Sequence, residues 1–415
     1  MKTAANAGRT VLRKTKLWLG SGGILLAGLA FAGCRTHDFP DYPANYREFA
    51  YVSNGASNTV SVFDVVNVRL DRQLQVGQNP TGVTANPKRN EVYVVNSGTA
   101  QANGSVSVID TEKNAVVATI PVQKQPYFLD LDAAGDLAYV ANSGSNSVSI
   151  LDMKTRREIG VAGVGEGPGL ARISQDGKSL VVTNRVGNSV SILGQSGGPS
   201  PDPSAWRTRK VIEGCPGATD AVILTDSSKA FVACSGGHQV MVIALARSGN
   251  ASFPARPDAL EALLDVGHSP VQLALKPDGG EVFVSNFDSD SISEIETTTD
   301  DVSGAYLMGP QPVHGLVSPD NSLLYVSNFR SQELSVYSIL DGKRVGPSIH
   351  GGTGPIHVGD GPDALAFSAS GHLLFAVDAR SGDLAVIRTS TGALFTLLPT
   401  GRQPNAIAIK AFRLN

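Results

Sequence analysis

The chain has 415 residues, with 34 Lys and Arg against 37 Asp and Glu and a formal net charge of −3. This balance argues against a protein that binds nucleic acid mainly through its phosphates, because such proteins need a dense basic surface. Charged residues make up only 17%, while Gly and Pro number 45 and 23, a turn-rich composition that excludes general disorder and fits a β protein.

Residues 1–33 have the order of an export signal. Basic residues at positions 9–16 precede an apolar run at 17–32, and small residues then lead to Cys34. This order resembles a bacterial lipoprotein signal, in which the cysteine after the cleavage site carries the lipid. Phe31 stands where that pattern usually has leucine, so ordinary secretion with cleavage nearby is the alternative. A retained membrane helix is disfavoured because the apolar run is short.

We therefore predict an exported protein, anchored to a membrane by a lipid on Cys34 and facing the periplasm or the cell surface. Without residues 1–33 the chain has 29 basic and 37 acidic residues, a charge of −8, which again disfavours nucleic acid as a partner. Residues 34–48 contain two prolines and no strand alternation, and are predicted to be a tether. Cys215 and Cys234 remain as an even pair in an oxidising compartment, so a disulfide between them is possible; two buried thiols are the alternative.

From residue 49 onwards one short pattern recurs: an apolar strand ending in Tyr/Phe-Val-x-Asn, a polar turn, and a strand of the type Val-Ser-Val-Ile-Asp. Successive copies are 42 to 52 residues apart, and they end at Asn54, Asn96, Asn142, Asn184, Cys234, Asn286, Asn328 and Asp378. A period of this size, built from short strands and turns, predicts a β-propeller. We interpret the recurring asparagines as structural residues that cap backbone groups or adopt left-handed geometry.

The copy at 126–164 shows one complete unit. Strands are predicted at 127–131, 137–142 and 147–152, followed by a weaker fourth strand after residue 155. These strands have the period-2 alternation of a sheet with one buried face. One unit is therefore a four-stranded antiparallel meander, which forms one blade.

A proline opens the first strand of each unit, at Pro80, Pro126, Pro168, Pro216, Pro270, Pro312, Pro362 and Pro404. The first Val-x-Asn strand, at 49–54, has no proline strand before it, and the last proline strand, at 404–410, has no Val-x-Asn strand after it. Together these two strands complete one blade, which closes the ring and removes the open sheet edge. We predict an all-β chain with a single propeller of eight blades at 49–412.

Three copies of the repeat carry a family resemblance. Tyr-Val-Ser-Asn at 51–54 and 325–328, and Tyr-Val-Ala-Asn at 139–142, resemble the YVTN-repeat β-propeller family, which includes YncE-like secreted bacterial proteins. The resemblance covers residues 46–412. It implies seven blades, the usual number in that family, whereas both markers occur eight times here. Seven blades is the alternative to our count, with the copy that ends at Cys234 as the one to reassign.

Three stretches lengthen the period. They are a Gly/Ser/Pro loop at 195–204, an insertion at 246–264 whose segment 258–264 has a helix-like composition, and a Gly- and His-containing stretch at 346–361. Insertions in a propeller fall on loops, where binding residues tend to lie.

The turns between second and third strands and the connections between blades emerge on one face, around the mouth of the central channel. The candidate ligand-binding residues on this face or just inside it are Arg185, Arg330, Arg380, Arg402, His238, His268, His314 and His357. Imidazoles could ligate a metal or haem or act as acid and base, but no metal-binding spacing is present, so no metal and no cofactor is predicted. Guanidinium groups suit an anionic ligand such as a carboxylate, a phosphate or a uronic sugar; solvated turn residues are the alternative.

These observations predict a non-catalytic binding scaffold of the cell envelope, whose polar face binds a protein, a glycan or a small anionic ligand. The first alternative is an enzyme or cofactor carrier, because YVTN-type repeats resemble those of lactonase-like and quinoprotein or haem d1-type propellers. No catalytic residue can be transferred from those families, so this alternative depends on the fold alone. The second alternative is a surface-layer or adhesion module.

Overall fold

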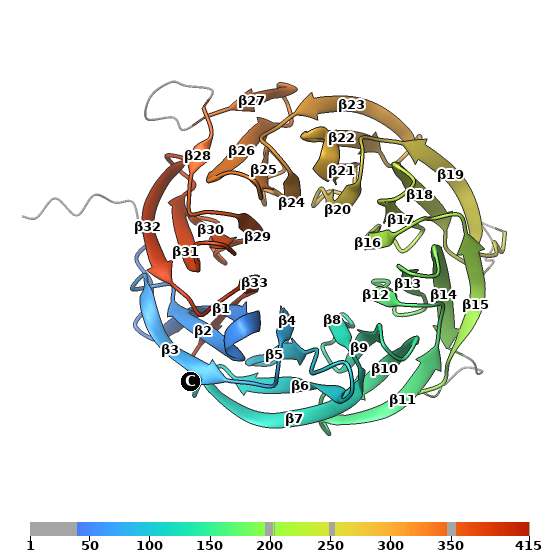
Figure 1. Cartoon of the computed structure of the whole chain (residues 1–415), viewed down its shortest axis with the longest axis horizontal. Helices are drawn as coiled ribbons and strands as arrows, with labels where there is room; N and C mark the ends of the chain where they lie inside the picture. The colour runs from blue at the N-terminus through green and yellow to red at the C-terminus, as the bar shows by residue number, and fades with distance from the viewer. Residues whose placement is uncertain (1–39, 196–201, 203, 249–253, 347–353, 415) are drawn as a thin grey trace, which may run out of the picture. The chain divides into compact units, whose positions relative to one another are not determined.

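The computed structural model describes residues 40–195, 202, 204–248, 254–346 and 354–414. These residues form eight antiparallel sheets that are arranged as blades around a ring (Figure 1). The predicted all-β propeller with eight four-stranded blades is confirmed, and the seven-blade alternative is wrong. The proposed signal segment, Cys34 and the tether up to residue 39 lie outside the described residues. In the part of the chain that is described, no helix is long and apolar enough to cross a membrane.

Each blade is a meander whose first strand is innermost. The inner strands, in ring order, are β33 (Pro404–Arg413), β4 (Pro80–Ala85), β8 (Pro126–Leu131), β12 (Pro168–Ile173), β16 (Ala218–Ile223), β20 (Pro270–Leu275), β24 (Pro312–Val317) and β29 (Pro362–Phe367). The second strands are β1 (Tyr46–Asn54), β5 (Glu91–Asn96), β9 (Leu137–Asn142), β13 (Leu180–Asn184), β17 (Lys229–Cys234), β21 (Glu281–Asn286), β25 (Leu323–Asn328) and β30 (Leu373–Asp378).

The outer half of each blade follows in the same order. The third strands are β2 (Thr59–Asp64), β6 (Asn103–Asp110), β10 (Ser147–Asp152), β14 (Ser189–Gln195), β18 (Gln239–Ala244), β22 (Ser291–Glu296), β26 (Glu333–Ser338) and β31 (Asp383–Arg388). The outer strands are β3 (Arg69–Gln75), β7 (Ala115–Lys124), β11 (Arg157–Gly163), β15 (Trp206–Glu213), β19 (Ala259–Asp265), β23 (Asp301–Leu307), β27 (Lys343–Val345) with β28 (Ile356–His357), and β32 (Ala393–Pro399). Two short 3₁₀ turns, η1 (Gly55–Ser57) and η2 (Phe287–Ser289), follow second strands.

The ring closes as the unmatched terminal strands predict. Strand β1 pairs antiparallel with β33, from Tyr46 opposite Arg413 to Asn54 opposite Pro404. The strand begins at Tyr46, three residues before the expected start of the domain, so the end of the predicted tether belongs to blade 1. Buried residues of blade 1, such as Tyr51 and Val60, pack against blade 2 in one apolar cluster. The closing blade thus has the same packing between blades as the others.

The repeated asparagine holds the second and third strands of its own blade together. Asn96 Nδ2 donates to Ser105 Oγ at 3.2 Å and to Ser107 Oγ at 3.0 Å. The same double contact recurs at Asn54, Asn142, Asn184 and Asn286. A glycine before the inner strand of the same blade packs on this residue, and a Cβ added to Gly77 would lie 2.7 Å from Asn96. The asparagines are therefore structural, as predicted.

Their backbone geometry differs from the prediction. Asn54 and Asn286 are extended, with φ of −119° and −99°, and the left-handed residues lie within the turns that follow. In those turns Asn58, Asn146 and Asn188 have φ between 49° and 56°, a region that asparagine tolerates better than most residues.

Blade 5 departs from the repeat at two paired positions. Cys234 replaces the asparagine, Cys215 replaces the glycine that packs on it, and the two are joined by a disulfide with Cα atoms 4.8 Å apart. The inner strand of this blade begins at Ala218, which pairs with Cys234 as Pro80 pairs with Asn96. The assignment of Pro216 as the first residue of this strand was therefore wrong by two positions.

The insertions include one wrong prediction. Segment 258–264 is not helical: Ala259–Asp265 forms outer strand β19, which pairs with β18. Its alanine, leucine and glutamate residues favour a helix locally, but the exposed edge of β18 offers backbone partners that override this preference. The central parts of all three insertions, residues 196–201, 203, 249–253 and 347–353, lie outside the described residues.

Candidate functional site

The inner strands lie nearest the axis of the ring (Figure 1). Their pairing is irregular just after the first residue. In β8, Pro126 pairs with Asn142 and Leu129 with Val140, so Tyr127 and Phe128 form a bulge. The same shift recurs in the other inner strands. Bulges re-aim side chains, and they do so here at the positions nearest the predicted channel mouth.

Several polar side chains of the inner strands connect neighbouring blades. Asp130 Oδ2 accepts a hydrogen bond from the amide of Ile173 at 3.1 Å, and Asp220 Oδ2 accepts one from the amide of Leu273 at 2.9 Å. Burial raises the pKa of the Asp130 carboxyl. Each of these carboxylates accepts a backbone N–H of the next inner strand, so their first role is to hold adjacent blades in register.

Three further side chains on the inner strands have no hydrogen-bond partner among the described residues. They are Tyr127 on β8, His314 on β24 and Asp363 on β29, from blades 3, 7 and 8. Burial raises the pKa of the Asp363 carboxyl to about 6 and lowers the pKa of the His314 imidazole to about 4. We call these three residues, together with the Arg172–Asp220 pair, the axial cluster.

Electrostatic interactions link Tyr127 to other members of the axial cluster. The carboxylates of Asp363 and Asp220, after burial, raise the pKa of Tyr127, and Arg185 lowers it. Tyr127 and Asp363 belong to blades that are not neighbours, so this interaction crosses the axis. The side chain of Tyr127 remains accessible, because 48% of the residue surface is exposed.

A charged pair forms the second half of the cluster. Arg172 Nη2 lies 3.5 Å from Asp220 Oδ1, and its guanidinium stacks on the ring of Phe128 at 4.6 Å. Both charges act on His314: Asp220 raises its pKa and Arg172 lowers it, but desolvation is the larger effect. His314 is therefore neutral at pH 7 and offers one nitrogen donor and one nitrogen acceptor.

The four predicted arginines do not meet in one site. Arg185 is exposed and acts on Tyr127 at the axis. Arg380 lies 3.7 Å from Asp360 and stacks on Phe329 at 4.4 Å, while Arg402 donates to the carbonyl of Ala56 at 3.0 Å. Arg330 is exposed in the turn after β25. Of the four, Arg185 is the one linked to the axial cluster, whereas Arg380 and Arg402 make contacts within or between turns.

The predicted histidines also separate. His238 and His268 stack with ring centroids 4.4 Å apart, and the amide of Ser269 donates to His238 Nδ1 at 3.2 Å. That hydrogen bond occupies the lone pair of the neutral ring, so His238 is a poor metal ligand in this arrangement. His357 lies 3.6 Å from Glu333 on the outer side of blade 7. The described residues contain no group of three or more His, Cys, Asp and Glu side chains suited to a metal ion.

Sequence reasoning identified His314 but missed Tyr127, Asp363 and the Arg172–Asp220 pair. Tyr127 and Asp363 directly follow the proline of their inner strands. Arg172 and Asp220 lie further along theirs. The sequence does contain a signal for two of them: the other copies of the repeat have Thr, Gly, Val or Asn directly after the proline, where Tyr127 and Asp363 stand in their copies. The repeat pattern favours candidates in the turns, whereas the residues that depart from the repeat lie on the inner strands.

No protein-family model and no curated relative matches this chain. Solved structures of similar shape include the dihydro-haem d1 dehydrogenase NirN, with a TM-score of 0.69 and 15% identity over 89% of this chain and 76% of that one. AztD from Citrobacter koseri gives 0.63 and 14%, over 89% and 99%. A putative 6-phosphogluconolactonase from Bacteroides uniformis gives 0.58 and 14%, over 88% and 100%. At these identities the likeness concerns the fold alone: the chain is an eight-bladed β-propeller.

Proposed function

We propose that this chain is an exported, lipid-anchored propeller of the YVTN-repeat type that binds a small acidic sugar at the axial cluster. The observation that carries the proposal is the set of three unpartnered polar side chains, Tyr127, His314 and Asp363. Polar groups that are half buried and lack partners keep their hydrogen-bonding capacity for a ligand. Elsewhere on the inner strands such groups form hydrogen bonds to the neighbouring blade, as Asp130 does.

The chemistry of the cluster supports a hydroxylated ligand with one acidic group. Asp363 is largely ionised at pH 7 and accepts hydrogen bonds from hydroxyl groups, while Tyr127 and neutral His314 can both donate and accept. Arg185, exposed beside Tyr127, is suited to pair with a carboxylate of the ligand. A simple inorganic anion would be repelled by the Asp363 carboxylate, and it would not use the hydrogen-bond donors and acceptors of Tyr127 and His314 together.

The test is calorimetric titration of the mature protein with D-glucuronate, and with D-glucose as the neutral control. We expect glucuronate to bind more tightly than glucose, and Asp363→Asn or Arg185→Ala to weaken its binding by about tenfold. Asp288→Asn, on the same face but outside the cluster, should have no effect. Binding should also weaken as the pH falls through about 6, because Asp363 is then protonated. Unchanged binding in both Asp363→Asn and Arg185→Ala would overturn the assignment, as would no binding of either sugar.

Export and lipidation can be tested separately. Cys34→Ser is expected to abolish incorporation of labelled palmitate and to move the protein from the membrane fraction to the soluble fraction of the producing cells. A variant that stays in the membrane fraction would instead favour a retained apolar segment.

One observation favours an enzymatic role at the same cluster. The pKa of Asp363, at about 6, is close to the value that suits a general base near neutral pH. The putative 6-phosphogluconolactonases among the similar structures make lactone hydrolysis the reaction to assay first. Turnover of a sugar lactone that is lost in Asp363→Asn would establish this alternative.

A further inference from the structure

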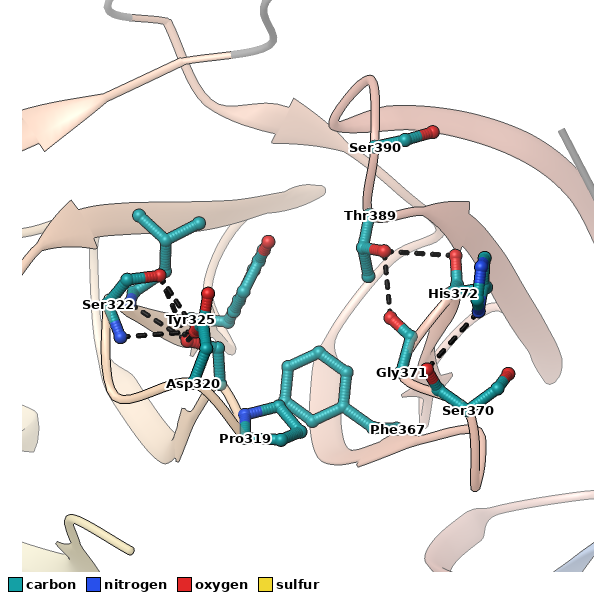
Figure 2. A pocket seen from close by; sticks show the side chains of 12 residues that line it. Pro319, Asp320, Ser322, Tyr325, Phe367, Ser370, Gly371, His372, Thr389 and Ser390 are labelled. Atoms are coloured by element: carbon teal, nitrogen blue, oxygen red, sulfur yellow. Dashed lines mark hydrogen bonds between the residues drawn. The ribbon is translucent and has the colours of Figure 1, made fainter. Parts of the chain in front are cut away.

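A pocket lies between blades 7 and 8, on the face opposite to the predicted channel mouth. It has a volume of about 420 Å³ and is lined by the first turns of both blades and by Thr389 and Ser390 (Figure 2). A second cavity of about 210 Å³ continues it outwards, and the two share Tyr325. The combined space is of the size that small-molecule sites have in proteins. We call the first of these cavities the seam pocket.

The seam pocket exists because one contact between blades is missing. In blade 1, Tyr51 donates its hydroxyl hydrogen to Asn114 Oδ1 of blade 2 at 2.5 Å. Tyr325 occupies the same place in blade 7, three residues before the repeated asparagine, and the residue of blade 8 that corresponds to Asn114 is Gly392. Gly392 lines the outer cavity and has no side chain to accept this hydrogen bond.

Tyr325 is consequently a buried polar group without a partner. It is 3% exposed, and its hydroxyl makes no hydrogen bond to any described residue. At this strand position Tyr51 and Tyr93 have hydrogen-bond acceptors, since Tyr93 donates to Glu91 at 2.6 Å, whereas Tyr139 packs edge to face on Trp206. Burial and the nearby Asp320 carboxylate raise the pKa of Tyr325 to about 12, so the hydroxyl stays protonated. A buried hydroxyl with no protein partner faces the space that a ligand would fill.

The remaining polar groups of the seam pocket are mainly acceptors. Ser318 and Ser322 hydroxyls donate to Asp320 Oδ1 at 2.5 and 2.8 Å, which holds the pKa of that carboxyl low and keeps it ionised. His372 Nδ1 lies 3.2 Å from the carbonyl of Ser370, which can only accept, so Nδ1 carries the proton and Nε2 keeps its lone pair. No Lys or Arg is among the residues that line the seam pocket.

Two aromatic rings complete the pocket. Tyr325 and Phe367 meet edge to face, with centroids 5.6 Å apart and planes 80° apart, and together they form an apolar corner of the pocket. Aromatic faces attract cations, and a carboxylate beside them strengthens that preference. We propose that the seam pocket binds a small organic ammonium ion, with the charge placed between Asp320 and the two rings.

The experiment compares choline with 3,3-dimethylbutan-1-ol, a neutral molecule of the same shape, by calorimetric titration of the mature protein. Choline is expected to bind at least about tenfold more tightly, because the charge is recognised by Asp320 and the rings. Equal binding of the two compounds, or no binding of choline, overturns the proposal.

Two variants locate the site. Asp320→Asn should weaken choline binding by about tenfold, whereas Asp341→Asn, which changes an exposed carboxylate of the same blade outside the pocket, should not change it.

The second variant, Gly392→Asn, introduces the residue type found at Asn114. Asparagine tolerates the positive φ of 63°, so the protein should stay folded, and the new side chain should accept the Tyr325 hydrogen bond, fill the outer cavity and weaken choline binding. Choline binding that is unchanged in Asp320→Asn and Gly392→Asn alike contradicts the location. Because neither variant touches the axial cluster, glucuronate binding should be unaffected in both.

Discussion

Replacing Asp378 by asparagine is expected to stabilise the folded chain, and the gain is expected to grow as the pH rises from about 4 to about 9. Asp378 stands where six other blades have the repeated asparagine, and it is fully buried. Its partner across the strands is Asp383, where most other blades have serine or threonine. Blade 8 thus holds two carboxyl groups in a place built for an amide and a hydroxyl.

The two carboxyl groups are held close together. The two residues are paired across β30 and β31, and Asp378 Oδ2 accepts the amide hydrogen of Gly359 at 3.0 Å. A Cβ added to Gly359 would lie within 2.6 Å of an oxygen of each carboxyl group. Burial, followed by the Asp383 carboxyl, raises the pKa of Asp378 to about 9, so the pair keeps one proton at neutral pH.

The direction of the pH effect follows from this shift. The folded chain binds the proton of Asp378 up to about pH 9, whereas an unfolded chain releases it near the ordinary value of 3.8. Stability is therefore highest below the unfolded value and is lost as the pH rises towards and through the folded value. An asparagine is neutral at every pH, and its amide can donate to Asp383, so it removes this loss.

Thermal unfolding between pH 4 and pH 9 measures the effect. At pH 8 we expect Asp378→Asn to be more stable than the parent by on the order of 2 kcal/mol, and at pH 4 to be nearly equal to it. Asp41→Asn, which removes an exposed carboxylate with no partner among the described residues, should leave the profile unchanged. A constant difference at every pH would mean that no shared proton is involved.

The second large effect is expected from loss of the disulfide in blade 5. Cys215 and Cys234 are 19 residues apart, and both are fully buried. A link across a loop of this length stabilises a protein by about 3 kcal/mol, largely by restricting the unfolded chain. The blade also lacks the hydrogen bonds of the repeated asparagine, because Gln239 and Met241 stand where most other blades have serine or threonine. The disulfide is therefore the main bond at this position of the blade.

Chemical denaturation with and without reductant tests this expectation. The oxidised parent should lose about 3 kcal/mol on reduction and approach the stability of the Cys215→Ala/Cys234→Ala double variant. The double variant should not respond to reductant, which controls for effects on the rest of the chain. If reduction leaves the parent as stable as before, the disulfide is not a stabilising element.

The strand pattern was predictable because its causes are local. The second and third strands of blade 3 were expected at 137–142 and 147–152, and the structure has β9 and β10 at those residues. Alternation of apolar residues and turn chemistry act within a few positions, and repetition makes them readable eight times. The outer strand β19 was missed because its residues prefer a helix until the edge of β18 is present to pair with them.

The candidate sites were much less predictable. Tyr127 and Asp363 are 236 positions apart in the chain, and nothing in either segment indicates that they interact across the axis. The histidines are candidates in the sequence because an imidazole can bind a metal or transfer a proton. In the structure, however, His238 Nδ1 accepts a hydrogen bond from the backbone amide of Ser269. Whether a polar side chain is occupied or free depends on neighbours from other blades, which the local pattern does not specify.

By itself, the sequence determined the architecture: an eight-bladed ring, closed by its last strand, with a repeated asparagine in a structural role. These features follow from short-range periodicity and from one unmatched strand at each end of the repeats. Only the tertiary structure decided which residues remain available for binding. Tyr325 lacks its partner because the residue opposite is Gly392 rather than asparagine, and Asp363 is buried on its inner strand with no donor among the described residues. Polar groups without a protein partner arise where residues from different blades, distant in the chain, come together.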